Sequence, residues 1–250
     1  MTTMDDLPPV SCIMPTYNRR RFVPLAVRYF LRQDYPNKEL IIVDDGTDPV
    51  ADLIPPDPRI RYLRLAHRAR VGAKRNLACE SSRASIIAHW DDDDWAARNR
   101  LSLQVKALLG TGVALCGARA LLHFDPEAAR AWRFTYPEDG RNWLVGGSLC
   151  YARELWVRRP FLDIDVGEDS HFVLATPRER TVALTDLTFQ VGILHRQNVS
   201  GKQPRTRNWQ PYPVGTIRAL LGPDWAAYAA WGPTRRKLHR QLLRWLRRPW

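Results

Sequence analysis

Four consecutive aspartates, Asp91 to Asp94, follow a short apolar run over residues 86–88, with His89 and Trp90 between them. A short apolar run bounded by polar residues predicts a strand that is buried on both faces, as in a parallel sheet. Its end would place several carboxylates at one edge of the sheet, where their mutual repulsion favours a bound divalent cation. A solvated acidic turn would satisfy the same charges, so the run alone leaves both interpretations open.

A second apolar run also ends in acids. Residues 40–43 are apolar throughout and lead into Asp44 and Asp45. Before them, residues 10–14 predict a strand, and residues 22–33 place their apolar side chains on one face of a helix. These three elements predict a βαβ unit whose second strand again delivers carboxylates to the sheet edge.

The alternation of strands and helices continues through the first 110 residues. We predict a strand over 60–65, a helix that begins at Val71, and a helix over 101–109 that ends at Gly110. This order predicts an α/β fold with a Rossmann-like, open, mostly parallel twisted sheet flanked by helices. Ligands of such sheets bind at the carboxyl ends of the strands, where both acidic runs lie.

The next 85 residues show a weaker pattern. Short strands are predicted over 113–116 and 120–124, followed by a loop or insertion over 125–143. Gly146 and Gly147 then precede another strand. Paired glycines at such a position indicate a close backbone approach, either to a ligand or to another segment of the chain.

Three more polar residues are candidates for a site. Glu168 and Asp169 open a predicted helix that ends at Ala175, where acids serve either as partners of the helix dipole or as catalysts. His195 ends a predicted strand over 188–195, and a lone histidine is either structural or a ligand. The start of the helix at Val71 carries basic residues and suits an anion.

Charge and cysteine usage bound the cellular setting. The net charge is +12, and seven positive charges with no acid lie in the last 17 residues, without which the net charge is +5. The four cysteines form no Cys-x-x-Cys pair and predict reduced, buried thiols in a cytoplasmic protein. The N-terminus lacks the apolar segment of a signal peptide, and no apolar run approaches the roughly 20 residues needed to span a membrane.

Six stretches, in this order and spacing, resemble family 2 glycosyltransferases, which have the GT-A fold. The resemblance covers roughly the first 200 residues, and the ordered set is far more specific than any one motif. The matching stretches are VSCIMPTYN (10–18), LIIVDDGT (40–47), GAKRNLA (72–78), HWDDDDW (89–95), GSLCY (147–151) and GEDSHF (167–172).

The resemblance implies a nucleotide-sugar donor, most commonly a UDP-sugar, and inversion at the anomeric carbon of the sugar. It also implies a nucleotide-binding set in which the first three residues lie along the nucleoside and Asp45, alone or with Asp44, accepts a hydrogen bond from the base. Arg75, on the helix that starts near Gly72, would lie beside the nucleotide, and Asp91 would lie nearer the ribose, with Asp92 a candidate for part of that work. The set is Pro15, Thr16, Tyr17, Asp44, Asp45, Gly72, Arg75, Asp91 and Asp92.

Asp91 and Asp93 look like the Asp-x-Asp motif of the family, which implies Asp93 as the direct ligand of Mg²⁺ or Mn²⁺ and Asp91 nearer the ribose. Because this chain has four aspartates in a row, Asp92 and Asp94 stay candidates for part of this work. His195 resembles a late histidine that helps to hold the metal or the diphosphate in some relatives. The predicted metal-ligand candidates are therefore Asp91, Asp93, Asp94 and His195.

The acidic pair completes the implied site. In the family the aspartate of this pair is the general base, which is Asp169 here, and Glu168 would orient the acceptor or support the base. One departure is that Arg98 and Asn99 stand where many relatives have a proline before the Arg-Leu pair. We expect this to alter a turn more than the chemistry.

The predicted domain organisation follows from these motifs. Residues 1–201 would form the GT-A domain, with a nucleotide-binding half over 1–110 and an acceptor-binding half over 111–201. Residues 202–250 would form a basic, aromatic, helical extension. In its last segment one helical side carries apolar residues between arginines, which fits either a peripheral helix on the inner face of an anionic membrane or a helix docked on the domain. Membrane docking would suit a lipid-linked or cell-surface polysaccharide acceptor.

Two other functions compete with glycosyl transfer. A nucleic-acid-binding protein would use the basic residues and tryptophans, but the chain has no recognised nucleic-acid motif. A nucleotidyltransferase on a related sheet would carry a glycine-rich loop after the first strand, whereas residues 15–18 contain no glycine. The sequence says nothing of the oligomeric state.

Overall fold

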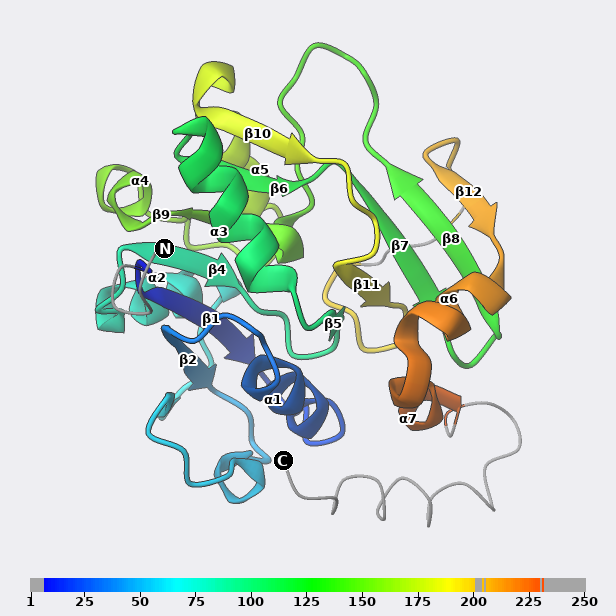
Figure 1. The fold of residues 1–250 in the computed structure, drawn as a ribbon. Coiled ribbons are helices and arrows are strands. Elements are labelled where there is room, and N and C mark those ends of the chain that lie inside the picture. The colour runs from blue at the N-terminus through cyan, green and yellow to red at the C-terminus, as the bar shows by residue number, and fades with distance from the viewer. Residues whose placement is uncertain (1–6, 201–203, 205, 230, 232–250) are drawn as a thin grey trace.

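A seven-stranded sheet forms the centre of the computed structural model, which describes residues 7–200, 204, 206–229 and 231 (Figure 1). The strand order is β10-β6-β9-β4-β1-β2-β3. Strands β4, β1, β2 and β3 run parallel, and so do β10 and β6, while β9 is antiparallel to both of its neighbours. The predicted open, mostly parallel sheet is confirmed. Its strands are β1 (Val10–Thr16), β2 (Lys38–Asp44), β3 (Ile60–Arg64), β4 (Ile86–His89), β6 (Leu115–Ala118), β9 (Cys150–Ala152) and β10 (Thr181–Leu184).

Helices cover both faces of this sheet. Helices α1 (Val23–Leu31) and α3 (Arg100–Thr111) share one hydrophobic cluster, and α2 (Val71–Ser81), α4 (Arg153–Arg158) and α5 (Glu168–Leu174) share the other. The period of two along a strand explains the division: Cys12 and Met14 of β1 lie in the first cluster, and Ile13 lies in the second.

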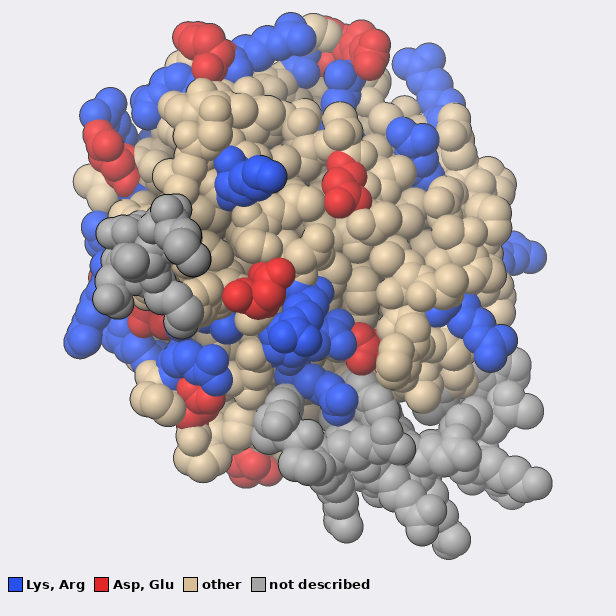
Figure 2. Space-filling model, in the orientation of Figure 1, with Lys and Arg blue, Asp and Glu red and all other residues tan. Residues whose placement is uncertain are grey.

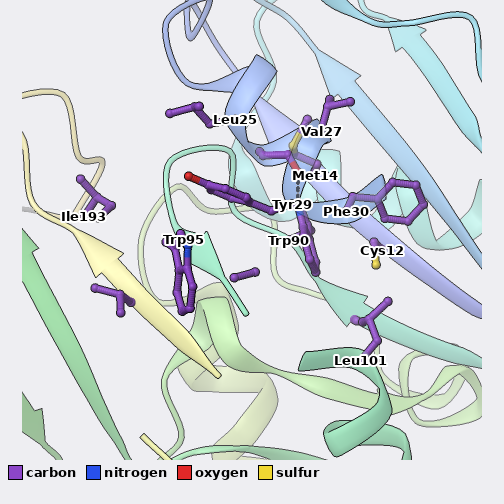
Figure 3. Packing of buried hydrophobic residues seen from close by; sticks show 14 of the residues in the cluster. Cys12, Met14, Leu25, Val27, Tyr29, Phe30, Trp90, Trp95, Leu101 and Ile193 are labelled. Carbon is purple, nitrogen blue, oxygen red and sulfur yellow. Dashed lines mark hydrogen bonds between the residues drawn. The ribbon is translucent and has the colours of Figure 1, made fainter. Parts of the chain in front are cut away.

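Large aromatic side chains fill the space beneath α1 (Figure 3). The rings of Phe30 and Trp90 meet edge to face at 6.2 Å, and those of Tyr29 and Trp95 meet at 6.5 Å. Trp90 is also tied to the helix, because its Nε1 donates to the carbonyl oxygen of Ala26 (3.0 Å). The two tryptophans that bracket the aspartates are therefore core residues that fix the acidic run to the sheet.

A second sheet, which the sequence did not predict, stands beside the first and has the order β12-β8-β7-β11-β5. The loop or insertion predicted over 125–143 is wrong in part, because β8 lies within it and pairs with β7 as a hairpin. Only Ala131 of the six residues of β8 is buried, so this strand lacks the apolar run that marks the strands of the first sheet. The strands are β5 (Trp95–Ala96), β7 (Ala120–Asp125), β8 (Arg130–Thr135), β11 (Gln190–Ile193) and β12 (Trp209–Tyr212).

The predicted helix end at Gly110 is also wrong. Helix α3 continues to Thr111 and ends at Gly112, whose φ of 68° lies in the left-handed region that glycine adopts without strain. Gly110 lies inside the last helical turn, where a Cβ added to it would meet no neighbouring atom within 4 Å. Short 3-10 turns occur at Ala51–Leu53, Gly146–Ser148, Arg178–Arg180 and Gly222–Asp224.

The described residues beyond 201 pack on the body. Strand β12 joins the second sheet, and helices α6 (Val214–Leu221) and α7 (Trp225–Ala229) follow it. The hydroxyl groups of Tyr228 and Tyr29 are 3.0 Å apart, and Asp224 accepts a hydrogen bond from Trp95 Nε1 (2.8 Å). The domain boundary at residue 201 stays a prediction. The helix predicted in the last segment lies outside the described residues.

Two further sequence predictions concern thiols and membranes. All four cysteines are buried and free, as predicted. Across the described ranges, no helix combines the length and the apolar character that crossing a membrane requires.

Candidate functional site

A cavity of about 920 Å³ opens where β1 and β4 end, at the edge of the sheet where the sequence predicts a ligand. Its size suits a nucleotide-sized small molecule. The end of β1, the start of α2, the acidic run, the 3-10 turn at 146–148 and the start of α5 all contribute to its wall. Most of the predicted site residues line it: Pro15, Thr16, Tyr17, Arg75, Asp91, Asp92, Asp93, Asp94, Glu168 and Asp169.

The four aspartates have different surroundings. Asp92 is buried, and its Oδ2 accepts a hydrogen bond from Thr16 Oγ1 at 2.6 Å. Asp94 accepts hydrogen bonds from Gln190 Nε2 (2.8 Å) and from the backbone N–H of Ile193 (3.1 Å). Asp92 therefore ties the acidic run to β1, and Asp94 ties it to β11.

Asp91 belongs to a buried ion cluster. Arg75 lies between two carboxylates, with its Nη2 3.4 Å from Asp91 Oδ1 and its Nε 3.0 Å from Glu168 Oε1. Burial opposes the charge of Arg75, but Asp91, Glu168 and Asp169 together raise its pKa above the ordinary arginine value. Burial also raises the pKa of Glu168, and Arg75 counters part of that rise. Arg75 thus holds the acidic run and the start of α5 together by charge.

Asp93 lies beside His195. Their Oδ2 and Nε2 atoms are 3.0 Å apart, and the imidazole stacks on Phe22 with ring centroids 4.3 Å apart. His195 Nδ1 accepts the backbone N–H of Gln197 (3.1 Å), so the neutral ring carries its proton on Nε2, toward Asp93. In this arrangement His195 orients Asp93, and a bond from Nε2 to a metal would first require loss of the Gln197 contact.

Asp169 and Asp91 face the two glycines that the sequence singled out. A Cβ placed on Gly146 would lie 1.4 Å from Asp169 Oδ2, and one placed on Gly147 would lie 2.3 Å from Asp91 Oδ2. The close approach predicted for these glycines is thus an approach to the chain's own carboxylates. Asp169 Oδ1 accepts the backbone N–H of Ser170 (2.6 Å). This leaves Oδ2 as the oxygen that lies over Gly146.

The turn that carries the glycines is held from the core side. Burial lowers the pKa of His89, so its ring is neutral. The ring donates a hydrogen bond through Nδ1 to the carbonyl oxygen of Gly146. Arg100 is buried and stacks on the Trp90 ring, 4.8 Å from its centroid. The bonds that hold the turn run from His89 Nδ1 to Gly146 O (2.7 Å), from Arg100 Nη2 to Gly147 O (2.8 Å) and from Gln104 Nε2 to Ser148 O (2.7 Å).

Asp44 and Asp45 shape the loop after β2. Asp44 is fully buried and accepts hydrogen bonds from the backbone N–H groups of Gly46 (2.8 Å) and Val50 (3.0 Å) and from the Tyr62 hydroxyl (2.8 Å). Asp45 Oδ1 accepts from Lys74 Nζ at 2.7 Å. Neither carboxylate lines the described cavity wall, and their contact with a base stays a prediction.

The start of α2 meets protein groups. A Cβ on Gly72 would lie 1.8 Å from the carbonyl oxygen of Leu162, so this glycine is required by chain packing. Its N–H donates to Ile164 O (3.0 Å), and the N–H of Val71 donates to Asp165 Oδ1 (3.2 Å). The groups that meet this helix start are therefore a carbonyl and a carboxylate of the chain itself, and its contact with a nucleotide stays a prediction.

Several residues of the site escaped the sequence analysis. Arg19 lies 3.7 Å from Asp93, Asn198 Nδ2 lies 3.3 Å from the same carboxylate, and the Arg68 guanidinium lies over the Tyr17 ring at 4.6 Å. Arg19 directly follows the Pro-Thr-Tyr-Asn stretch, and Asn198 is three residues from His195. Their closeness in sequence to predicted site residues is the one feature that could have identified them. Arg68 precedes α2 and had no such indication.

The donor set of the cavity suits a hard cation. Within the described ranges, no group of three or more His, Cys, Asp or Glu side chains is arranged to hold a metal ion. Mg²⁺ and Mn²⁺ in nucleotide sites are commonly bound through one or two carboxylates together with substrate phosphates. Asp91 and Asp93, with oxygen donors on the cavity wall, fit that requirement.

We predict that Asp92→Asn stabilises the protein at alkaline pH. Burial, with the charge of Asp93 nearby, raises the pKa of Asp92 to about 8. The folded state then binds more protons than the unfolded state between about pH 4 and pH 8, so the free energy of unfolding falls as pH rises through this window. Asparagine still accepts the Thr16 hydrogen bond and does not ionise. Calorimetry in EDTA at pH 8.5 should give the variant a Tm at least about 2 °C above that of wild type. The difference should vanish near pH 4. A variant Tm below that of wild type at pH 8.5 would contradict the raised pKa of Asp92.

Comparison with known proteins identifies the family and the fold of the chain. The family model described as "Glycosyl transferase family 2" matches residues 11–163. Among curated relatives, the candidate colanic acid biosynthesis glycosyl transferase WcaA of Escherichia coli K12 is 38% identical over 105 residues, which are 40% of this chain and 38% of the relative. EpsJ of Bacillus subtilis, an uncharacterized glycosyltransferase, is 29% identical over 69% of this chain and 57% of its own length. The chain thus spans less than half of the first relatives it matches.

Solved structures share the fold. The mannosyltransferase PcManGT from Pyrobaculum calidifontis, in complex with GDP-Man and Mn²⁺, has a TM-score of 0.60 and 20% identity, covering 91% of this chain and 65% of that one. TarS of S. aureus, in complex with UDP-GlcNAc, has a TM-score of 0.57 and 15% identity, covering 93% of this chain and 77% of that one. The GT-A fold is therefore confirmed, and the chain belongs to glycosyl transferase family 2.

Proposed function

We propose that the protein is an inverting, metal-dependent glycosyltransferase that moves a sugar from a nucleoside diphosphate donor, of which a UDP-sugar is our first choice, to an acceptor hydroxyl. One observation carries the proposal. Asp91 and Asp93, which could bind a cation, line the same cavity as Asp169, which could act as a base. Gly146 lies against Asp169, and Gly147 lies against Asp91. Such a transfer needs both a cation at the leaving group and a base at the attacking hydroxyl.

The end of β1 and the acidic run would bind the donor. Tyr17 offers a ring face for the nucleoside, and Asp91 and Asp93 would hold Mg²⁺ or Mn²⁺ at the diphosphate. When bound, the cation would act as a Lewis acid that stabilises the negative charge of the leaving diphosphate. His195 fixes the orientation of Asp93 through the 3.0 Å contact and the stacking on Phe22.

Asp169 supplies the proton acceptor. Its Oδ1 is occupied by Ser170, so Oδ2 receives the proton of the acceptor hydroxyl as the new glycosidic bond forms. A single displacement, with the hydroxyl attacking opposite the leaving diphosphate, inverts the anomeric carbon.

We further propose that the acceptor belongs to a cell-surface glycan or a glycolipid. One relative, WfgD of Escherichia coli, is named as a glucosyltransferase for α-D-GlcNAc-diphosphoundecaprenol and is 31% identical over 42% of this chain and 43% of its own length. A lipid-linked acceptor would place the enzyme at the inner face of a membrane. Vesicle flotation of the full chain with anionic and with neutral vesicles tests the membrane part separately.

We predict that Asp93→Ala strongly weakens metal-dependent nucleotide binding. Wild type, titrated calorimetrically with UDP, GDP and dTDP in Mn²⁺ and in EDTA, should bind at least one nucleotide in Mn²⁺ alone. The variant loses the carboxylate that faces the diphosphate position, and its affinity should fall by at least about tenfold, the equivalent of 1.4 kcal/mol. Asp186→Ala, at a partly exposed carboxylate that closes its own turn with Thr188, is the control and should bind as wild type. Absence of metal-dependent binding for all three nucleotides would overturn the proposal.

Nucleic-acid binding has weaker support. On the face shown in Figure 2, lysine and arginine side chains are interspersed with acids. A nucleic-acid groove would gather them along one stripe. The same calorimetric series with a DNA and an RNA oligonucleotide distinguishes the alternatives, because salt-sensitive binding that survives Asp93→Ala would favour the nucleic-acid function.

A further inference from the structure

We propose that Phe134, Tyr136 and Trp209, which we call the aromatic wall, bind a pyranose ring of the acceptor. The inference rests on the proposed transferase function and deepens it by naming the acceptor class as a saccharide. All three side chains line the cavity that holds the acidic run and Asp169.

Strand pairing builds the wall. Trp209 of β12 and Phe134 of β8 are directly opposed across the antiparallel pair, and their ring centroids are 5.0 Å apart. The rings of Phe134 and Tyr136 meet edge to face at 4.8 Å. His123 of β7 lies against the Trp209 ring at 4.7 Å and is buried. The wall is therefore a continuous surface on the second sheet.

The wall is held in place and half exposed. Tyr136 stacks on Trp143 with ring planes 11° apart, so a further ring supports its orientation. Phe134, Tyr136 and Trp209 each keep part of their surface accessible. Aromatic side chains fixed in this way give contact area at little further cost in conformational entropy.

The wall adjoins the proposed base. The Tyr136 hydroxyl lies near the side chains of Ser170 and Asp169, and Ser170 donates its backbone N–H to Asp169 (2.6 Å). A group resting on the wall therefore lies within reach of the carboxylate that would accept its proton. The donor residues, by contrast, come from the end of β1 and from the acidic run on the first sheet.

The chemistry of a sugar ring matches this arrangement. A pyranose presents C–H groups on its faces and hydroxyls around its edge. The faces suit the negative face of an aromatic ring, and a hydroxyl at the edge would point toward Asp169. An acyl chain would need apolar walls on all sides, whereas this wall borders the carboxylates of Asp169 and Glu168. The geometry thus favours a saccharide as the group that occupies it.

Saturation-transfer NMR on the full chain with Mn²⁺ replaced by diamagnetic Mg²⁺ tests the inference. The probes are the methyl glycosides of glucose, galactose, mannose and N-acetylglucosamine, in the presence of UDP. We expect at least one glycoside to receive saturation, strongest at the ring protons of one face. Trp209→Ala and Phe134→Ala should each lower that saturation at least about fivefold, and Trp209→Phe should retain most of it.

Trp132→Ala is the matched control. Trp132 lies on β8 two residues from Phe134, is partly buried and does not belong to the described cavity wall. Its removal should leave the glycoside signal unchanged. The inference is overturned if no glycoside receives saturation, or if the signal survives in both Trp209→Ala and Phe134→Ala while their circular dichroism matches wild type. Because UDP titration is measured on the same samples, loss of nucleotide binding in wild type would mark failure of the transferase proposal instead.

Discussion

Asp169→Asn is expected to lower the transfer rate by about 10²- to 10⁴-fold, the usual contribution of a general base. The amide is isosteric and its Oδ1 still accepts the Ser170 N–H, which measures 2.6 Å in the wild-type carboxylate. The side chain therefore keeps its place, and only its ability to take a proton is lost. The measurement is nucleotide release from the sugar donor that wild type uses in a screen of UDP-, GDP- and dTDP-sugars.

Nucleotide binding separates this effect from a general loss of structure. Asp169→Asn should bind UDP with Mn²⁺ as wild type does, because the donor contacts lie on Asp91 and Asp93. Glu154→Gln makes the same change of carboxylate to amide on α4, where the side chain is 65% exposed and pairs with Arg158. Its rate should equal that of wild type. An Asp169→Asn variant that keeps more than a tenth of the rate would show that another group takes the proton.

The centre of the first sheet was predictable because β1, β2 and β4 are almost entirely buried and each ends at a polar boundary. The edge strand β10 is partly exposed and was not predicted. Periodicity identified β1, β2 and β4 together with their order along the chain. It could not identify β8 or β12, because strands that are partly exposed carry mixed residues, with Arg133 and Gln210 next to aromatic ones. The second sheet is also joined by pairings between distant segments, such as β11 with β5 and β12 with β8, which no local pattern encodes.

The site was predictable as a set of motifs and less so as a set of contacts. Sequence order implied that Asp91, Asp93 and Asp169 share a site, and all three line one cavity. The division of labour within the four aspartates depends on Gln190 and Ile193, which lie far along the chain, and on Thr16. Neighbours of this kind come from tertiary structure, so a single sequence does not reveal them.

Gly146→Ala is expected to be nearly as damaging as loss of the base. The new Cβ would lie 1.4 Å from Asp169 Oδ2 and 2.8 Å from Asp169 Cβ, so rotation of the aspartate side chain alone does not relieve the clash. Either the turn or the start of α5 must move by about 1 Å, and a displacement of that size costs on the order of 10²-fold in rate. His89 and Arg100 resist movement of the turn. Nucleotide release should therefore fall about 10²-fold.

The two glycines should differ in what they impair. Gly147→Ala would displace Asp91, because Asp91 Oδ2 lies 2.3 Å from the position of the new Cβ. This variant should therefore weaken Mn²⁺-dependent UDP binding. Gly146→Ala should leave UDP affinity within about threefold of wild type. Gly110→Ala is the control, because it lies in α3 with open space around it. It should keep full activity and gain roughly 0.5–1 kcal/mol of stability from the helix preference of alanine. Nucleotide release by Gly146→Ala as fast as by Gly110→Ala would contradict this prediction. The contact between this turn and Asp169 would then have no part in catalysis, because a base that is displaced by about 1 Å should lose activity.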